Sequence, residues 1–286
     1  MKEPYGKLPL PKMTPYLLSL MKNGKVFDLG TVRSEDMPLW SGHPPFRVLP
    51  YKWHGETEDV TPPGTLYNDM VITCMHAGTH VDAFNHIGEI QGGGTIILGE
   101  GVDAEKTREW WGCNWMDGSK FHPIILRAVI LDILNYKGGE DTGGQVTLPR
   151  KYGITAEDIR GCLDSQNIEI KPNVPTAFLI RTGMIKYFHN KTDNYGGNAA
   201  GPNLEAEKYM ASIGGVLTGS DTVSYEQMIV GEHTVHRWMM QNGILMNEVL
   251  DLEEICKAGV TEGVYIALPL KIKGTSGSLI DPIVIT

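Results

Sequence analysis

The sequence predicts an α/β fold, because segments rich in β-forming residues alternate with segments that carry helix-capping signals. The 286 residues are enough for one large domain with a substantial buried core. No internal repeat, low-complexity tract or convincing linker divides them. We therefore expect a single domain that spans residues 1–286.

The expected strands are of two kinds. Several alternate apolar and polar residues, whereas 128–133 is a nearly continuous apolar run, typical of a strand buried on both faces. Stretches rich in glycine and proline, at 38–65 and 88–122, are not typical of regular structure. The expected strands are 25–29, 68–75, 124–134, 176–181, 215–218, 244–250, 264–270 and 280–285.

The expected helices are marked by their ends. Thr14 followed by Pro15 is a favourable start, and Thr155 with Asp158 forms a capping box. Asn203 is a further N-cap residue. The first helix runs from Pro15 to the Asn23–Gly24 stop, the second into 159–163, the third over 204–211, and the fourth over about 225–241 to the Asn242–Gly243 stop.

The composition argues against several classes of binding partner. The net charge is −9 without a basic stripe, which argues against a nucleic acid or an anionic membrane. No run approaches the ~18 apolar residues of a membrane span, and the apolar part of the N-terminus is too short for a signal peptide. The four cysteines are widely spaced and form no C-x-x-C pair, as in a reduced chain. We expect a cytoplasmic protein that binds a small molecule.

Metal-ligating side chains gather in residues 76–86, which read HAGTHVDAFNH. On a straight strand, His76 and His80 would lie ~13 Å apart, too far for one ion bound at ~2.1 Å from each. On a helix, Asp82 would point roughly 200° away from them. A glycine turn at Gly78 resolves this conflict. We therefore expect His76 at the end of the strand 68–75, with His80 and Asp82 in the loop beyond it.

His86 lies four residues beyond Asp82. It is either a fourth ligand or an acid/base residue beside the ion. We favour the acid/base role, because a catalytic metal site keeps one position open.

A second group consists of His233, His236 and Glu248. The expected helix 225–241 and strand 244–250 are joined by a tight turn, which can bring Glu248 near one of the two histidines. His233 and His236 are one turn apart on a helix, so only one of them need face the site. The alternative is that these residues are a solvated helix face and a strand-end carboxylate.

Residues 76–86 resemble the signature H-x-G-T-H-x-D-x-P-x-H of the cyclase family of metal-dependent hydrolases, which includes kynurenine formamidase and isatin hydrolase. Every fixed position agrees except Phe84, which stands where proline is usual. Further segments resemble other parts of the family pattern: 26–29 with 37–38, 179–183, 219–222, the pair His236 and Glu248, and 277–278.

The resemblance implies an α/β fold with a mixed, partly barrel-like β-sheet flanked by helices, assembled as a homodimer or homotetramer. It implies one or two divalent ions, Zn²⁺ or Mn²⁺. His76, His80 and Asp82 would bind the first ion, and Asp82, His236 and Glu248 would hold a second where one is present. His86 would be the acid/base residue, and it is His236 rather than His233 that matches the family.

The function expected is hydrolysis of an amide, lactam or lactone bond in a small cyclic or aryl substrate. Phe84 and Trp40 would pack against the substrate ring. No G-x-S-x-G motif supports a serine nucleophile. Two alternatives stay open: ring closure or dehydration on the same metal platform, and metal binding without catalysis. The tryptophans of the glycine-rich stretches either line a pocket mouth or pack beneath long loops.

Overall fold

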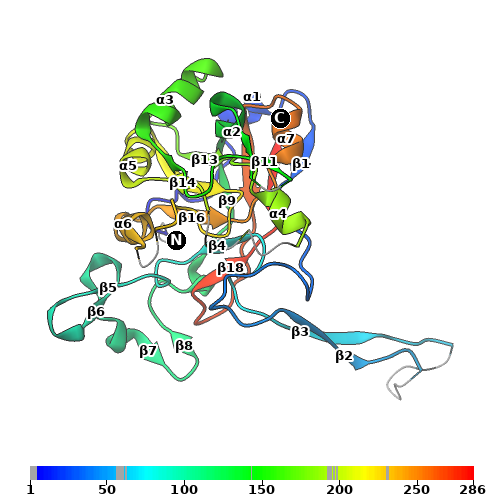
Figure 1. The fold of residues 1–286 in the computed structure, drawn as a ribbon. Helices are drawn as coiled ribbons and strands as arrows, with labels where there is room; N and C mark the ends of the chain where they lie inside the picture. The colour runs from blue at the N-terminus through cyan, green and yellow to red at the C-terminus, as the bar shows by residue number, and fades with distance from the viewer. Residues whose placement is uncertain are drawn as a thin grey trace.

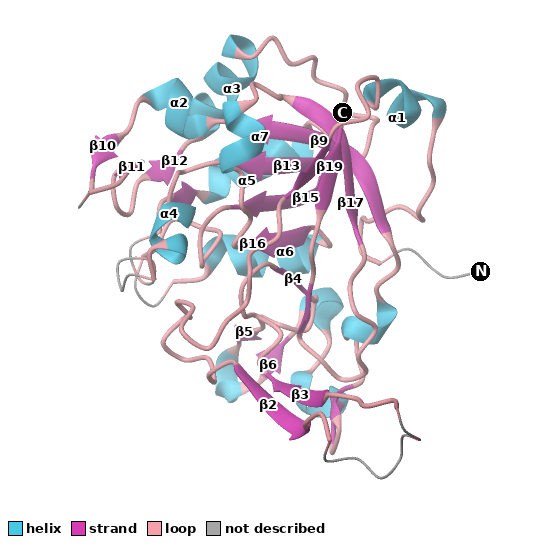
Figure 2. Cartoon of the chain, turned by 90° about the vertical axis from the view of Figure 1, so that its right-hand side faces the viewer, coloured by secondary structure: helices cyan, strands magenta, loops and turns pink. Residues whose placement is uncertain are grey.

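A large mixed β-sheet forms the centre of the molecule (Figures 1 and 2). The computed structural model describes residues 5–55, 61, 63–142, 144–191, 195, 197, 199–229 and 232–286. Within these residues the strand order across the sheet is β1 (Val26–Asp28), β19 (Ile283–Ile285), β17 (Glu262–Ala267), β9 (Ile124–Leu131), β13 (Thr176–Ile180), β15 (Gly215–Ser220), β16 (Leu245–Glu248), β4 (His80–Asp82) and β18 (Gly277–Leu279).

The middle of the sheet is parallel and its flanks are antiparallel. β9, β13, β15 and β16 run parallel to one another, whereas β17, β19 and β1 on one side and β4 and β18 on the other pair antiparallel. Every residue of β13 is buried, as expected for a parallel strand covered on both faces. Among the described strands, β1 and β18 each pair on one side only, so the sheet is open and not closed into a barrel.

Helices cover both faces of this sheet. α3 (Ala156–Ser165), α5 (Leu204–Ser212) and α6 (Thr234–Asn242) lie side by side on one face, and α4 (Ile185–His189) and α7 (Glu253–Lys257) lie on the other (Figures 1 and 2). α1 (Pro15–Leu20) packs against β17, and α2 (Ile133–Lys137) packs against α3. The predicted α/β class, with a mixed sheet flanked by helices, is confirmed.

The expected helix caps are present. Thr14 accepts the N–H of Leu17, and Thr155 and Asp158 form both hydrogen bonds of the capping box. Asn203 caps α5, and Gly243 ends α6 in the left-handed region. These features depend on residues within one turn of each other, which is why they are readable from sequence.

Several expected elements differ from the structure, three of them substantially. The helix expected from 225 begins only at Thr234. β9 ends at Leu131 because Asp132 turns to cap α2 and accepts the N–H of Asn135. β3 (Asn68–Ile72) lies outside the main sheet and pairs with β2 (Arg47–Lys52) in a hairpin that extends from the body (Figure 1). The expectation that 38–65 lacks regular structure was therefore wrong at β2, which becomes a strand through its pairing with β3.

The remaining elements are short. They are β5 (Glu89–Ile90), β6 (Ile96–Ile97), β7 (Arg108–Glu109), β8 (Gly112–Cys113), β10 (Glu140–Asp141), β11 (Val146–Thr147), β12 (Gly153–Ile154) and β14 (Gly201–Pro202), with 3₁₀ turns at Gly92–Gly94, Gly99–Gly101, Ala104–Thr107 and Gly118–Lys120. Among the described residues, no helix has both the length and the apolar character that crossing a bilayer requires.

Candidate metal centre

A sharp turn folds the histidine motif back on itself. Gly78 has a φ of +63°, a left-handed conformation that glycine adopts without steric cost. The next residue, Thr79, holds the turn in place by donating its hydroxyl to the carbonyl of Val249 at 2.6 Å. As a result the rings of His76 and His80 lie only 5.0 Å apart between centroids.

His80 and Asp82 lie on a strand, so their expected placement in a loop was wrong. β4 pairs on both edges, with His80 opposite Glu248 of β16 and Asp82 opposite Gly277 of β18. His76 also does not end a strand, because β3 stops at Ile72. The sheet itself therefore fixes the backbone that carries two of the candidate ligands.

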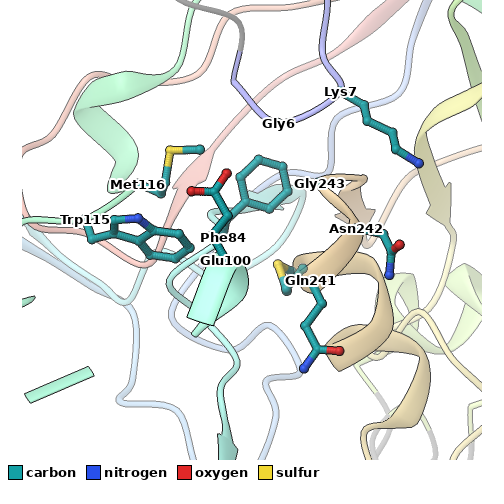
Figure 3. Close-up of a pocket in the computed structure, with 10 residues that line it drawn as sticks. Gly6, Lys7, Phe84, Glu100, Trp115, Met116, Gln241, Asn242 and Gly243 are labelled. Atoms are coloured by element: carbon teal, nitrogen blue, oxygen red, sulfur yellow. The ribbon is translucent and has the colours of Figure 1, made fainter. Parts of the chain in front are cut away.

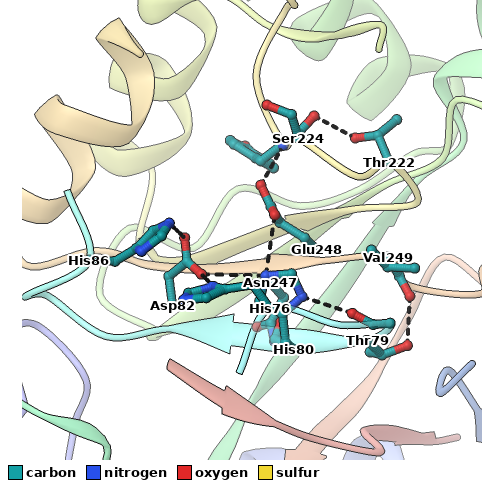
Figure 4. Close-up of polar contacts among 12 residues, drawn as sticks. His76, Thr79, His80, Asp82, His86, Thr222, Ser224, Asn247, Glu248 and Val249 are labelled. Carbon is teal, nitrogen blue, oxygen red and sulfur yellow. Dashed lines mark hydrogen bonds and ion pairs between the residues drawn. The ribbon is translucent and has the colours of Figure 1, made fainter. Parts of the chain in front are cut away.

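His80 is oriented by a hydrogen bond to its own turn. Its Nδ1 lies 2.8 Å from the carbonyl oxygen of Gly78, which accepts the Nδ1 proton, so Nε2 is the nitrogen available to a metal ion. This Nε2 faces two carboxylates, at 3.5 Å from Asp82 Oδ1 and 3.3 Å from Glu248 Oε2 (Figure 4). One imidazole nitrogen and two carboxylates thus converge from three side chains.

The convergence fits a divalent cation. His80 Nε2 and Asp82 Oδ2 are buried and have no hydrogen-bond partner among the described residues, and such groups are costly unless a cation compensates them. His76, His80 and Asp82 each offer one ligand atom, and these atoms lie within 4.8 Å of one another. Imidazole and carboxylate donors suit zinc and manganese.

His76 is held by hydrogen bonds on both ring nitrogens. Nδ1 lies 2.9 Å from Asp82 Oδ1, and Nε2 lies 2.8 Å from the hydroxyl of Ser276. Its ring stacks on that of His86 with 4.0 Å between centroids. The motif therefore forms one compact cluster of side chains.

His86 stands at the edge of the cluster. Its Nε2 lies 4.0 Å from Asp82 Oδ2, and its side chain keeps 24% of its exposure (Figure 4). Burial lowers the pKa of His86 to about 4, with Asp82 opposing the shift and His76 adding to it. The ring is therefore neutral at pH 7.

His236 and Glu248 lie together against the same cluster. His236 Nε2 is 3.2 Å from Glu248 Oε1, while Glu248 Oε2 faces His80. Of the two histidines at the start of α6, His236 is the one that reaches Glu248. The side chain of His233 is 43% exposed and lies 3.8 Å from Glu226.

The cluster shifts the pKa values of its members. Burial lowers the pKa of His80 and of His236, but the adjoining carboxylates outweigh it and raise both to about 10. Burial raises the pKa of Glu248, but the adjoining His236 and His80 lower it to about 2. The pKa of Asp82 is held well below its usual value, because neighbouring histidines outweigh its burial. Both carboxylates are therefore ionised, and a metal ion bound between them would displace the protons that His80 and His236 hold without it.

Phe84 occupies the position where the family pattern has proline. Its ring is 1% exposed and stacks on Tyr5 with 4.7 Å between centroids. Its backbone N–H donates to the hydroxyl of Tyr5 at 3.2 Å, a bond that proline could not make. The ring also borders a cavity of about 340 Å³ beside Trp115 and Met116 (Figure 3). Packing against Tyr5 therefore accounts for phenylalanine in place of the family's proline. Contact between Phe84 and a substrate stays a prediction.

Trp40 is partly buried against the core. Its carbonyl accepts the N–H of His43 at 2.9 Å, which forms the turn that carries the His43 ring to within 5.7 Å of His76 between centroids. The glycine- and proline-rich stretch that contains Trp40 therefore reaches the metal cluster. By contrast, Trp110 is 95% exposed. Substrate contact by Trp40 stays a prediction.

Three residues near the ligands were not singled out from the sequence. They are His43, Glu226 and Ser276. Glu226 lies ten positions before His236 and outside the helix, which begins at Thr234. Helical periodicity therefore does not relate the two residues. Only the fold brings these residues to the cluster.

The profile of a family described as putative cyclase matches residues 27–227, more than half of the chain. The chain belongs to the cyclase family. The candidate ligands His76, His80 and Asp82 fall within the matched region, whereas His236 and Glu248 lie beyond it. No curated protein matches the chain.

Solved structures share the fold over nearly their full length. One described as a novel cyclase is 22% identical with a TM-score of 0.82, covering 96% of this chain and 92% of that one. An isatin hydrolase bound to the product analogue thioisatinate is 17% identical with a TM-score of 0.63, covering 94% and 95%. A predicted metal-dependent hydrolase from Bacillus stearothermophilus is 19% identical with a TM-score of 0.53, covering 91% and 97%.

Proposed function

We propose that this member of the cyclase family is a metal-dependent hydrolase that opens an amide, lactam or lactone bond of a small cyclic or aryl substrate. The observation that carries the proposal is the meeting of buried, unpartnered acceptors on His80 and Asp82 with Glu248, beside the partly exposed ring of His86. The shared fold with an isatin hydrolase supports the substrate class.

Each residue of the cluster has a role in this proposal. His76, His80 and Asp82 would hold one divalent ion, zinc or manganese, and Asp82, His236 and Glu248 would hold a second where one is present. The ion supplies Lewis-acid chemistry for the attack of water on a carbonyl. His86 accepts the proton of the attacking water and returns it to the leaving nitrogen or oxygen. Phe84 and Trp40 would pack against the substrate ring.

The experiment pairs metal analysis with a substrate screen. Protein purified without added metal is analysed for bound ions and assayed on isatin-like, N-formyl-aryl and lactone compounds. At saturating metal, His86→Ala should lower kcat by roughly 100-fold or more and leave the metal content unchanged. His189→Ala is the matched control, because His189 pairs with Asp251 outside the cluster. Turnover of the His86 variant within a few-fold of the parent protein would disprove the acid/base role.

A second candidate is ring closure or dehydration on the same metal platform, which the family's description as putative cyclase favours. Both reactions need a Lewis acid and one proton shuttle. The product mass separates them, since hydrolysis adds one water to the substrate. Metal binding without catalysis is the third possibility, and it requires that metal removal unfolds the protein while no amide or lactone is hydrolysed.

The proposal extends to the setting of the protein. We infer a homodimer or homotetramer, a small molecule as the partner in place of a nucleic acid or membrane, and a cytoplasmic location. The net charge of −9 supports the choice of partner. The apolar residues exposed on the β2–β3 hairpin support the assembly.

A further inference from the structure

Glu226 is a buried carboxylate at the back of the metal cluster. Its side chain is only 5% exposed, and both oxygens are engaged. Oε1 lies 2.5 Å from His236 Nδ1, and Oε2 accepts the backbone N–H of Val235 at 2.8 Å. Burying a carboxylate is costly unless hydrogen-bonding partners compensate it. Here they come from α6, the helix that carries His236.

The contact with Glu226 decides which nitrogen of His236 can bind a metal ion. The carboxylate accepts the Nδ1 proton at 2.5 Å, so Nε2 is the nitrogen left for an ion. Nε2 points at Glu248 Oε1, 3.2 Å away, a distance at which the two groups share a proton when no metal ion is bound. A metal ion that displaces this proton has both groups in place as ligands. The geometry thus prepares Nε2 to bind an ion jointly with Glu248.

Glu226 also fixes the position of the ring along the chain. α6 has no side-chain cap from His233, its N-cap residue. The carboxylate of Glu226 takes that place, because it accepts the N–H of Val235 and, at 3.4 Å, the N–H of His236. The same group therefore orients the imidazole and anchors the helix turn from which it projects.

We propose that Glu226 is a positioning residue that holds His236 in the tautomer whose Nε2 binds the ion shared with Glu248. The inference rests on the proposed function, in that it requires an ion at this position. A competing arrangement exists on the other side of the ring, where Glu226, His233 and His236 offer ligand atoms within 4.8 Å of one another. That arrangement needs a deprotonated Nδ1, so the two are mutually exclusive.

The experiment compares Glu226→Ala, Glu226→Gln and His233→Ala with the parent protein. Zinc stoichiometry and affinity are measured by competition with a chromophoric chelator. The histidine tautomers of the zinc-loaded parent are read from ¹⁵N shifts, with His236→Gln assigning the signal. His233→Ala is the matched control, because its ring also faces Glu226 but its side chain is 43% exposed and does not reach Glu248.

The proposal expects Glu226→Ala to weaken the zinc site of His236 by about 10- to 100-fold, the range for partners that orient a metal-binding histidine. Glu226→Gln should lose less, since its single amide oxygen can still accept from His236 Nδ1, although the NH2 group cannot replace the oxygen that accepts from Val235. If Glu226→Ala does not fold, the zinc affinity of Glu226→Gln tests the proposal instead. His233→Ala should leave affinity unchanged, and His236 should carry its proton on Nδ1.

Three results would overturn the proposal: unchanged zinc affinity in both Glu226 variants, a proton on His236 Nε2 in the zinc-loaded protein, or an equal loss of affinity in His233→Ala. The third would assign the ion to Glu226, His233 and His236. A parent protein that binds no zinc or manganese would instead overturn the proposed function, and this inference with it. The two failures are therefore distinguishable.

Discussion

His80 and Glu248 face each other across the antiparallel strands β4 and β16, and His80 Nε2 lies 3.3 Å from Glu248 Oε2. They are directly opposite in the register, so their contact follows from strand pairing and not from loop conformation. A one-residue slip would turn one side chain to the other face of the sheet. The register of a central sheet thus fixes the distance between two candidate ligands.

This relationship makes His80 the residue on which metal binding depends most. His80→Ala removes the imidazole that both Asp82 and Glu248 face, leaving two buried carboxylates that repel each other. We expect affinity for zinc or manganese to fall by more than the roughly 100-fold typical of supporting residues. Elemental analysis measures the bound metal, and competition with a chelator measures the affinity.

The control for that measurement is Asn247→Ala. Asn247 lies next to Glu248 on β16, and its amide donates to the carbonyl of His80 without offering a ligand atom to the cluster. Loss of the Asn247 side chain should lower the free energy of unfolding but leave the metal stoichiometry unchanged. Full metal content in His80→Ala would show that the ion, if bound, lies elsewhere.

Glu207 gives a pH dependence that is separate from the metal cluster. It is fully buried, and burial raises its pKa from 4.5 to about 7, although hydrogen bonds from Tyr225 and Thr218 oppose the shift. The folded state therefore binds the proton more tightly than the unfolded state. The free energy of unfolding should fall as pH rises from about 4.5 to about 7, by on the order of 3 kcal/mol from this group.

Glu207→Gln isolates that contribution, because glutamine does not titrate. The difference in unfolding free energy between parent and variant, measured in urea at several pH values, should change across this window and be flat above it. Other groups cancel in the difference. A difference that is independent of pH would show that Glu207 titrates alike in the folded and unfolded states.

Arg127 and Glu262 form an ion pair that should be costly to break. The side chain of Arg127 is 1% exposed, and its Nε lies 2.8 Å from Glu262 Oε1. Glu262→Ala leaves the buried guanidinium without its carboxylate. Because Glu262 itself is 28% exposed, we expect Glu262→Ala to lower the free energy of unfolding by about 2 kcal/mol. That is less than the roughly 3–5 kcal/mol lost when a fully buried pair is broken.

The exposed pair Glu254 and Lys257 provides the comparison. Their side chains are 78% and 77% exposed, and Glu254→Ala should cost less than about 1 kcal/mol. Urea unfolding of both variants tests the contrast. Equal losses in the two would mean that water reaches Arg127 in the folded protein.

Features encoded locally were predictable, and those that depend on distant pairing were not. The capping box at Thr155 and the glycine stop at Gly243 were read from neighbouring residues. β4 was not, since its three residues become a strand only through β16 and β18, which lie far along the chain. Likewise, residues from Tyr225 onward have helical character, but the N–H of Tyr225 donates to Glu248 instead, a case of tertiary contact overriding propensity.

The same distinction applies to the candidate site. The ligand types and the turn at Gly78 follow from the spacing within 76–86, because one ion requires its ligands close together. Glu226 and Ser276 reach His236 and His76 only through the fold. Their residue types are common on surfaces, so no pattern in the sequence separates them from solvated side chains.

The β2–β3 hairpin leads to a prediction about assembly. It extends from the body (Figure 1), and apolar side chains are exposed on both of its faces, with Met70 at 49% and Val71 at 54%. An isolated two-stranded hairpin is marginally stable in water. Exposed apolar surface of this kind is typical of a protein–protein contact. We therefore expect the hairpin to be covered by a second copy of the chain in the proposed homo-oligomer.

Charged residues on one face of the hairpin should weaken that assembly. Val48 and Val71 are register partners, so Val48→Asp with Val71→Asp places two like charges on the same face. Light scattering after size exclusion should show a shift from the oligomer to the monomer. Leu18→Asp is the control, because it changes a residue 55% exposed on α1 and should leave the mass unchanged. A parent protein of monomeric mass, or a double variant that keeps the oligomeric mass, would remove the hairpin from the interface.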